Sequence, residues 1–180
     1  KDTLSSNRFL ESTKGAESFL KANDYFLTVH MTDQTEQSVS KTLDTLCSKN
    51  VGSIILFPSA DAELYYRAQQ RGIHLIFLDS VPHGIQANLV SCDNVSGGYS
   101  ATSHLLSRGY DRVAALYGNP DSIPIIQRIE GYKFALKHAG LPIKEEYIRS
   151  FRESEGTFYG RVEDLIKQWR NLEKPPNAIF

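Results

Sequence analysis

Histidine and cysteine are the residues best suited to act as general bases, nucleophiles or metal ligands, and their spacing here favours none of these roles. The five histidines are His30, His74, His83, His104 and His138. They are dispersed, and none has a serine, a cysteine or a second histidine at a spacing typical of a catalytic triad or a metal site. Cys47 and Cys92 belong to no Cys-x-x-Cys pair, so we expect two buried, reduced thiols. The sequence thus predicts neither catalytic residues nor a metal.

Two adjacent glycines, Gly97 and Gly98, stand at the head of an apolar helical run in "DNVSGGYSATSHLLSRGYDRVAALYG" (93–118). A phosphate cradle would need G-x-G-x-x-G after a strand or G-x-x-x-x-G-K-[S/T] before a helix, because such glycines let backbone N–H groups close on phosphate oxygens. Neither pattern is present, and no cofactor is predicted. "GYSAT" also lacks the Gly-x-Ser-x-Gly elbow of hydrolases. The structural alternative is that small residues let this helix, capped by Asn94, lie close to another backbone.

Several residues suit the binding of a small molecule better than catalysis: Ser6, Phe9, Ser59, Asp79 and Arg128. Arg128 is predicted to open a helix, where a cation opposes the helix dipole unless an anionic or hydroxylated group faces it, and its forked donors suit sugar hydroxyls. Asp79 ends an apolar run, where a carboxylate can accept hydroxyl hydrogens or cap a turn. Phe9 could stack on a sugar or join the core. The two serines could equally cap helices.

Apolar runs and amphipathic stretches alternate along the chain and must position these residues. The apolar runs are rich in Ile, Val, Leu and Phe, as expected of strands buried on both faces, and lie at 25–30, 51–57, 73–79, 111–118 and 177–180, with a shorter run at 88–92. Most amphipathic stretches end at residues that tolerate a left-handed backbone: Asn23, Asn50, Gly72, Gly109 and Gly140. The alternation predicts an α/β fold with parallel sheets covered by helices, in which ligands bind at the carboxyl ends of strands.

Composition and charge exclude several classes of function. With 180 residues and 41% hydrophobic residues, the chain can bury a sizeable core in one large domain or two small ones. Its net charge of -1 and its scattered Lys and Arg residues predict that this segment itself binds no DNA. No apolar stretch approaches the roughly 18 residues of a membrane span, and the first residues lack the apolar core of a signal peptide. The turn-rich break at 80–94 predicts a domain border.

Several motifs together resemble one known family. They are "SSNRFLESTKGAE" (5–17), "KNVGSIILFPS" (49–59), "RGIHLIFLDS" (71–80), "DNVSGGYSATSHLLSRGYDRVAALYGNPDS" (93–122), "RIEGYKFALKHAGLPI" (128–143) and "PPNAIF" (175–180). They resemble the effector-binding region of the LacI/GalR family of bacterial transcription regulators, which shares its fold with periplasmic sugar-binding proteins. Phe151 matches a position where the family often carries an aromatic stacking residue. The resemblance covers nearly the whole segment.

The resemblance implies an α/β, type I periplasmic-binding-protein-like fold of two doubly wound parallel-sheet subdomains, incomplete at both ends. The first subdomain would be residues 1–92, without its first strand, and residues 93–180 would begin the second. A multi-strand hinge would join them, with the glycine pair at its exit, and a small effector, commonly a sugar or nucleobase, would be clamped between them.

The resemblance also implies a cytoplasmic homodimeric repressor that binds operator DNA through a head upstream of Lys1, with no membrane partner. The alternative is a periplasmic sugar-binding protein that serves a transporter. We favour the regulator, because residues 98–118 resemble the regulators more closely.

Overall fold

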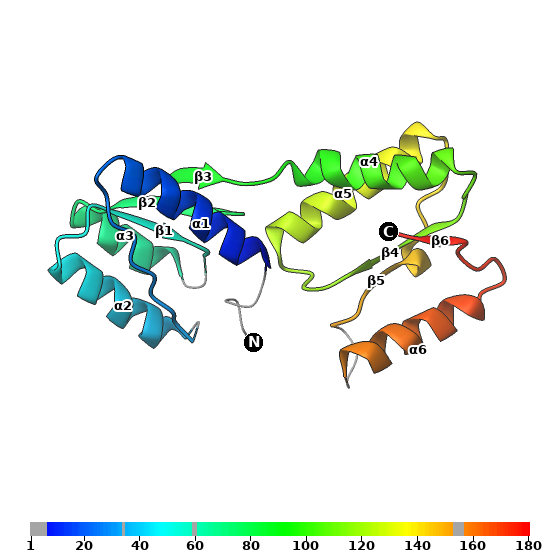
Figure 1. The fold of residues 1–180 in the computed structure, drawn as a ribbon. Coiled ribbons are helices and arrows are strands. Elements are labelled where there is room, and N and C mark those ends of the chain that lie inside the picture. Colours follow the sequence, from blue (N-terminus) through cyan, green and yellow to red (C-terminus); the bar gives the residue numbers. More distant parts are fainter. Residues whose placement is uncertain (1–6, 34, 59–60, 153–156) are drawn as a thin grey trace. The chain divides into compact units, whose positions relative to one another are not determined.

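The computed structural model describes residues 7–33, 35–58, 61–152 and 157–180, with the side chains of residues 7–9 left out (Figure 1). The chain divides into two compact units. Residues 1–51 and 59–71 form the first unit, and residues 52–58 and 72–180 form the second. None of the described helices is long and apolar enough to cross a membrane. The predicted subdomain border near residues 90–95 stays a prediction.

The first unit is helical in its described part, with α1 (Asn7–Ala22), α2 (Glu36–Ser48) and α3 (Ala62–Gln70). Helix α2 begins after Thr35, whose hydroxyl accepts a hydrogen bond from the Ser38 amide at 3.3 Å. Beyond the end of α3, the Arg71 guanidinium donates to the Asp44 carboxylate at 2.8 Å and so ties α3 to α2. The apolar face of α2 is buried, as its helical spacing predicts.

The strand predicted at residues 25–30 is wrong. This segment has no strand conformation and leaves most of its apolar side chains in solvent, with Phe26 99% exposed. A short apolar run favours a strand, but a strand persists only where its N–H and C=O groups are paired with a neighbouring strand. Among the described residues, none pairs with residues 25–30.

The first sheet contains three parallel strands in the order β1-β2-β3: β1 (Ser53–Leu56), β2 (His74–Leu78) and β3 (Asn88–Val90). All three lie where apolar runs predicted them. Burial on both faces is wrong for β1, however, because alternate residues of this strand are exposed, Ile55 among them. The edge strand β3 also exposes Leu89 and Val90. The prediction of two buried thiols is also wrong, because Cys92, which follows β3, is exposed and Cys47 on α2 is half-buried.

The second sheet has the order β5-β4-β6 and is also parallel, with β4 (Val113–Tyr117) between β5 (Ile148–Ser150) and β6 (Ala178–Ile179). Helices α4 (Asn94–Ser107) and α5 (Ile123–His138) cover one face and α6 (Phe158–Arg170) covers the other (Figure 1). Alternate residues of β4 divide between the two layers. Val113 and Ala115 pack with Tyr132 of α5, whereas Ala114 packs with Trp169 of α6. This sheet is therefore doubly wound, as predicted.

Strand β5 and the short 3-10 helix before it, η2 (Glu145–Tyr147), were not predicted. Only one of the three residues of β5, Ile148, is a large apolar residue, so no apolar run marks the strand in the sequence. Its pairing with β4 places Ser150 beside Tyr117 and buries it almost completely. Position in the sheet, rather than side-chain hydrophobicity, makes this segment a strand.

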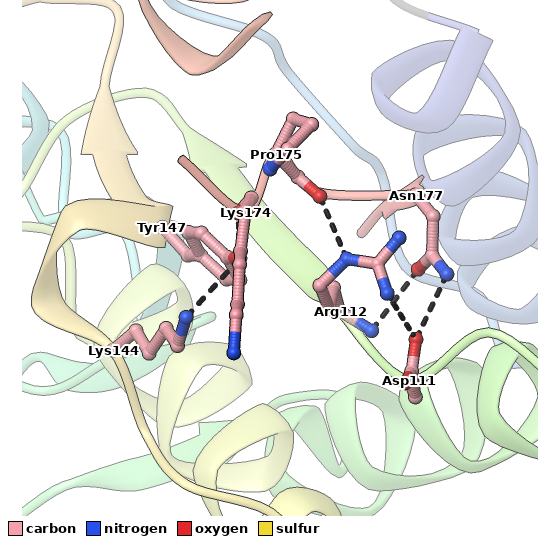
Figure 2. Close-up of polar contacts among 7 residues, drawn as sticks. All are labelled: Asp111, Arg112, Lys144, Tyr147, Lys174, Pro175 and Asn177. Carbon is pink, nitrogen blue, oxygen red and sulfur yellow. Dashed lines mark hydrogen bonds and ion pairs between the residues drawn. The ribbon is translucent and has the colours of Figure 1, made fainter. Parts of the chain in front are cut away.

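The segment that leads into β6 is anchored by polar contacts, which Figure 2 shows. The Arg112 side chain donates from Nε to the Pro175 carbonyl at 2.9 Å, and its backbone amide donates to the Asn177 side chain at 3.0 Å. The Tyr147 hydroxyl donates to the Lys174 carbonyl. These contacts hold a strand of only two residues in its place beside β4.

Most predicted helix ends agree with the structure. Asn50, Gly72, Gly109 and Gly140 all have positive φ angles. After α1, Asp24 rather than Asn23 takes this conformation. The left-handed residue ends each helix locally, which is why a sequence pattern predicts it.

Tyr132→Phe should lower the free energy of unfolding by about 1 kcal/mol at neutral pH, because the completely buried Tyr132 hydroxyl donates to the Val113 carbonyl at 2.8 Å. Burial also raises the pKa of Tyr132. The folded state therefore keeps this proton at a pH where the unfolded chain releases it, and the native protein loses stability as the pH rises above about 10. Urea denaturation should show a smaller difference between the two proteins at about pH 10.5 than at neutral pH. A constant or growing difference would contradict this assignment.

Candidate functional site

The carboxyl ends of β4 and β5 bring an aromatic side chain beside the start of α5. Phe151 follows β5, and its amide donates to the Tyr117 carbonyl at 3.0 Å. A Cβ at Gly118 would lie 3.2 Å from the Phe151 ring and 3.7 Å from Ile125 in α5. Phe151 is half-buried and meets Phe158 edge to face, with ring centroids 4.9 Å apart. A partly exposed, oriented ring at this end of a parallel sheet can stack on the apolar face of a ligand.

The turn after β5 is fixed by a buried hydroxyl. Ser150 is 1% exposed, and its Oγ donates to the Gly118 carbonyl at 2.5 Å while accepting from the Arg152 amide at 3.1 Å. These two bonds connect the carboxyl ends of β4 and β5. The backbone on both sides of Phe151 is therefore held in place before any ligand arrives.

The adjacent glycines have different surroundings. A Cβ at Gly98 would lie 2.1 Å from the Arg128 carbonyl oxygen, and one at Gly131 would lie 2.1 Å from the Val95 carbonyl oxygen. Nothing lies within 4 Å of a Cβ at Gly97. Helices α4 and α5 thus cross backbone against backbone at Gly98 and Gly131, which confirms the structural interpretation for Gly98 alone.

Arg128 lies further along its helix than the sequence predicts. Helix α5 begins at Ile123, so Arg128 is in the second turn, not the first, and the expected opposition to the helix dipole is weaker. The side chain is exposed, and its Nε donates to Asn94 Oδ1 at 2.9 Å. In the described part of the chain this is its one hydrogen bond, which leaves the Nη donors for a ligand.

Asp93, not Asn94, caps α4, which corrects the predicted start of this helix by one residue. The Asp93 carboxylate accepts a hydrogen bond from the Ser96 amide at 2.9 Å, and this bond lowers the pKa of Asp93. Asn94 is instead buried, at 4% exposure. Its Nδ2 donates to the Cys92 carbonyl at 3.1 Å and to Gln127 Oε1 at 3.3 Å. The sequence gives no sign of these contacts of Asn94, since its partners in α5 lie more than thirty residues away.

Asp79 lies at the carboxyl end of β2, where the sequence predicts it. It has a positive φ of 71°, which Asp tolerates better than most residues, and its amide donates to the Val90 carbonyl at 3.0 Å. The carboxylate is half-buried. Ser6 and Ser59 lie outside the described residues, as does the side chain of Phe9.

The structure brings Phe151 and the start of the Arg128 helix to the same end of the second sheet, and it places Asp79 at the corresponding end of the first. These are the strand ends at which α/β folds bind ligands. Within the described ranges, no group of three or more His, Cys, Asp or Glu residues could hold a metal ion.

Known proteins are similar in sequence to this chain over nearly its whole length. The ribose operon repressor of Escherichia coli K12 is 29% identical over 182 residues, which cover 99% of this chain and 54% of the repressor. The arabinose metabolism transcriptional repressor of Halalkalibacterium halodurans is 23% identical, and the match covers 98% of this chain and 48% of that protein. The chain thus spans about half the length of these curated relatives.

Solved structures show the same fold. The transcription regulator CcpA of Lactococcus lactis matches 98% of this chain and 74% of its own with a TM-score of 0.75 and 17% identity. A periplasmic binding protein/LacI transcriptional regulator of Alkaliphilus metalliredigens, complexed with D-xylulofuranose, matches 98% of this chain and 73% of its own with a TM-score of 0.71 and 18% identity. The type I periplasmic-binding-protein-like fold class is thereby confirmed.

A sequence model of one family agrees with both sets of relatives. It describes the periplasmic binding proteins and the sugar-binding domain of the LacI family, and it matches residues 3–169. The match includes the whole first sheet, strands β4 and β5 of the second sheet, and all the candidate residues. The chain therefore belongs to the family formed by the periplasmic binding proteins and the sugar-binding domains of LacI-type regulators.

Proposed function

We propose that this chain is the effector-binding domain of a bacterial transcriptional repressor and that its effector is a sugar or a related metabolite. The observation that carries the proposal is the family match over residues 3–169, together with relatives that are named as repressors of ribose and arabinose genes. These relatives are regulators, not enzymes, and the same is proposed for this chain. They also favour the repressor over the periplasmic carrier that the sequence left open.

The candidate residues supply the chemistry that a sugar requires. Arg128 presents its Nη donors to ring hydroxyls, and the Asp79 carboxylate accepts hydroxyl hydrogens. Phe151 stacks on the C–H face of the ring, because it is oriented at the carboxyl end of β5 and partly exposed. Phe9, Ser6 and Ser59 complete the proposed ligand-binding set, on the sequence pattern alone.

In this scheme, the effector regulates DNA binding because the two binding events are thermodynamically linked. An effector that binds one conformation of the repressor better than another shifts the population by the difference of its two affinities. The same coupling changes the affinity for operator DNA, which a separate head domain binds in the proposed scheme. In a cytoplasmic homodimer, the same population shift would change the DNA affinity of two such head domains at once.

A thermal-shift screen of the purified protein, in its full natural length, tests this function. The compounds are D-ribose, L-arabinose, D-xylulose, cellobiose and, as a non-sugar, adenine. A sugar at about 100 times its Kd should stabilise the folded protein by about 2.7 kcal/mol and so raise its Tm. The same sugar should change the affinity for operator DNA in a gel shift. Stabilisation by adenine alone, or by none of these compounds, would contradict a sugar effector.

A further inference from the structure

Asn94 occupies an unusual place for a polar side chain. It is the first residue of α4, yet it is 4% exposed, and its amide group makes contacts on both of its polar atoms. Oδ1 accepts from Arg128 Nε at 2.9 Å. Nδ2 donates to the Cys92 carbonyl at 3.1 Å and to Gln127 Oε1 at 3.3 Å. A buried amide is stable only when its donors and acceptor are paired, and here they are.

We propose that Asn94 is a positioning residue that holds the Arg128 guanidinium in its ligand-binding orientation. Arginine has five N–H donors in a planar fork, so a bond to Nε fixes the plane of the group and leaves the Nη donors on its far edge. Arg128 is exposed, and without this bond its long side chain would sample many rotamers. A donor that is oriented in advance loses less entropy when a ligand binds. This inference rests on the proposed function, in which Arg128 binds the effector.

The close crossing of α4 and α5 makes this contact rigid. The Arg128 backbone carbonyl lies against Gly98, one turn of α4 beyond Asn94, so neither helix can slide without a steric clash. Asn94 therefore meets Arg128 at a fixed separation. Its amide also binds the carbonyl of Cys92, in the segment that joins β3 to α4. The orientation of Arg128 thus depends on the backbone of that segment.

A competing interpretation is that Asn94 serves the fold alone. It predicts that Asn94 variants lose stability and that any effect on binding is independent of Arg128. The positioning role predicts the opposite, namely that the effect of Asn94 on binding disappears when Arg128 is absent. A double-mutant cycle separates the two interpretations.

The experiment is calorimetry on the purified protein in its full natural length, with D-ribose, L-arabinose and cellobiose each tested as probes. Asn94→Ala should weaken binding of the sugar that the wild type binds by about tenfold, the size expected for a hydrogen bond to a charged group. Asn94→Asp keeps an oxygen acceptor for Nε and should stay within about threefold. In an Arg128→Ala background, Asn94→Ala should cause no further loss. The control variant Gln127→Ala removes one partner of the Asn94 amide without touching the bond to Arg128, and it should bind like the wild type.

A second measurement needs no ligand. The Arg128 Nε–H signal in NMR spectra should exchange slowly with water in the wild type and in Asn94→Asp, and rapidly in Asn94→Ala. Asn94→Ser, whose side chain is too short to reach Nε, replaces Asn94→Ala if that variant does not fold. Rapid exchange in the wild type would overturn the proposal whatever the variants do.

The outcomes distinguish this inference from the proposed function. If Arg128→Ala weakens sugar binding and Asn94→Ala does not, the positioning role alone is wrong. Equal losses from Asn94→Ala with and without Arg128 would also overturn it, because Asn94 would then act independently. If Arg128→Ala leaves sugar affinity unchanged, or the wild type binds none of the probes, the inference fails together with the role of Arg128 on which it rests.

Discussion

Gly131→Ala should lower the free energy of unfolding by about 3 kcal/mol, at the upper end of what overpacking a protein interior costs. The added Cβ would lie 2.1 Å from the Val95 carbonyl oxygen and 2.6 Å from the Tyr99 amide nitrogen, both of them backbone atoms of α4. Backbone atoms in a helix cannot turn aside as a flexible side chain can, so α4 and α5 must separate. Gly98→Ala should have a similar effect, because its Cβ would meet the Arg128 carbonyl oxygen at 2.1 Å.

Gly97→Ala is the matched control, since Gly97 is next to Gly98 in the same helix and has open space around it. Alanine favours a helix over glycine by about 0.5–1 kcal/mol, so this variant should be slightly more stable than the wild type. Urea denaturation followed by circular dichroism measures all three variants. Gly98→Ala or Gly131→Ala proteins as stable as Gly97→Ala would show that the two helices do not cross in close contact.

Arg128→Ala should weaken sugar binding at least tenfold while the protein stays folded. Charge-assisted hydrogen bonds are worth about 1.5–3 kcal/mol each, and the loss of even one accounts for a factor of about ten or more. Arg128 is exposed, so its own burial contributes little to stability. Its removal nevertheless leaves the buried Asn94 Oδ1 without its donor. We therefore expect a loss of about 1 kcal/mol in the free energy of unfolding.

The control for charge is Arg170→Ala, which removes an exposed arginine from the last turn of α6. It should leave both sugar affinity and stability within experimental error, since surface substitutions usually change stability by less than about 0.5 kcal/mol. Calorimetry and urea denaturation on the same preparations compare the two variants. Unchanged affinity in Arg128→Ala, or a loss of stability above about 3 kcal/mol, would identify Arg128 as a structural residue instead.

Local features of this protein follow from the sequence alone. The residues that end helices are an example: Asn50, Gly72, Gly109 and Gly140 adopt the left-handed conformation that their types favour. The apolar runs that became β1, β2 and β4 are another, because a continuous apolar stretch between two helices favours a strand that those helices cover. The family resemblance reached further than these patterns, since it rests on several motifs along the whole chain, and it predicted the fold that the structure has.

Pairing between distant segments was decided only by the tertiary structure. Residues 25–30 have the composition of a strand and β5 does not, yet β5 has β4 as a neighbour, whereas no described residue pairs with 25–30. The contact from Asn94 to Arg128 and the crossing at Gly98 and Gly131 join residues about thirty positions apart. Propensity and periodicity describe a residue with its neighbours within a turn or two. The contact of the Asn94 amide with the Arg128 guanidinium, and that of Gly98 with a facing carbonyl, both depend on where helix α5 lies against α4. Packing of the whole unit fixes that position.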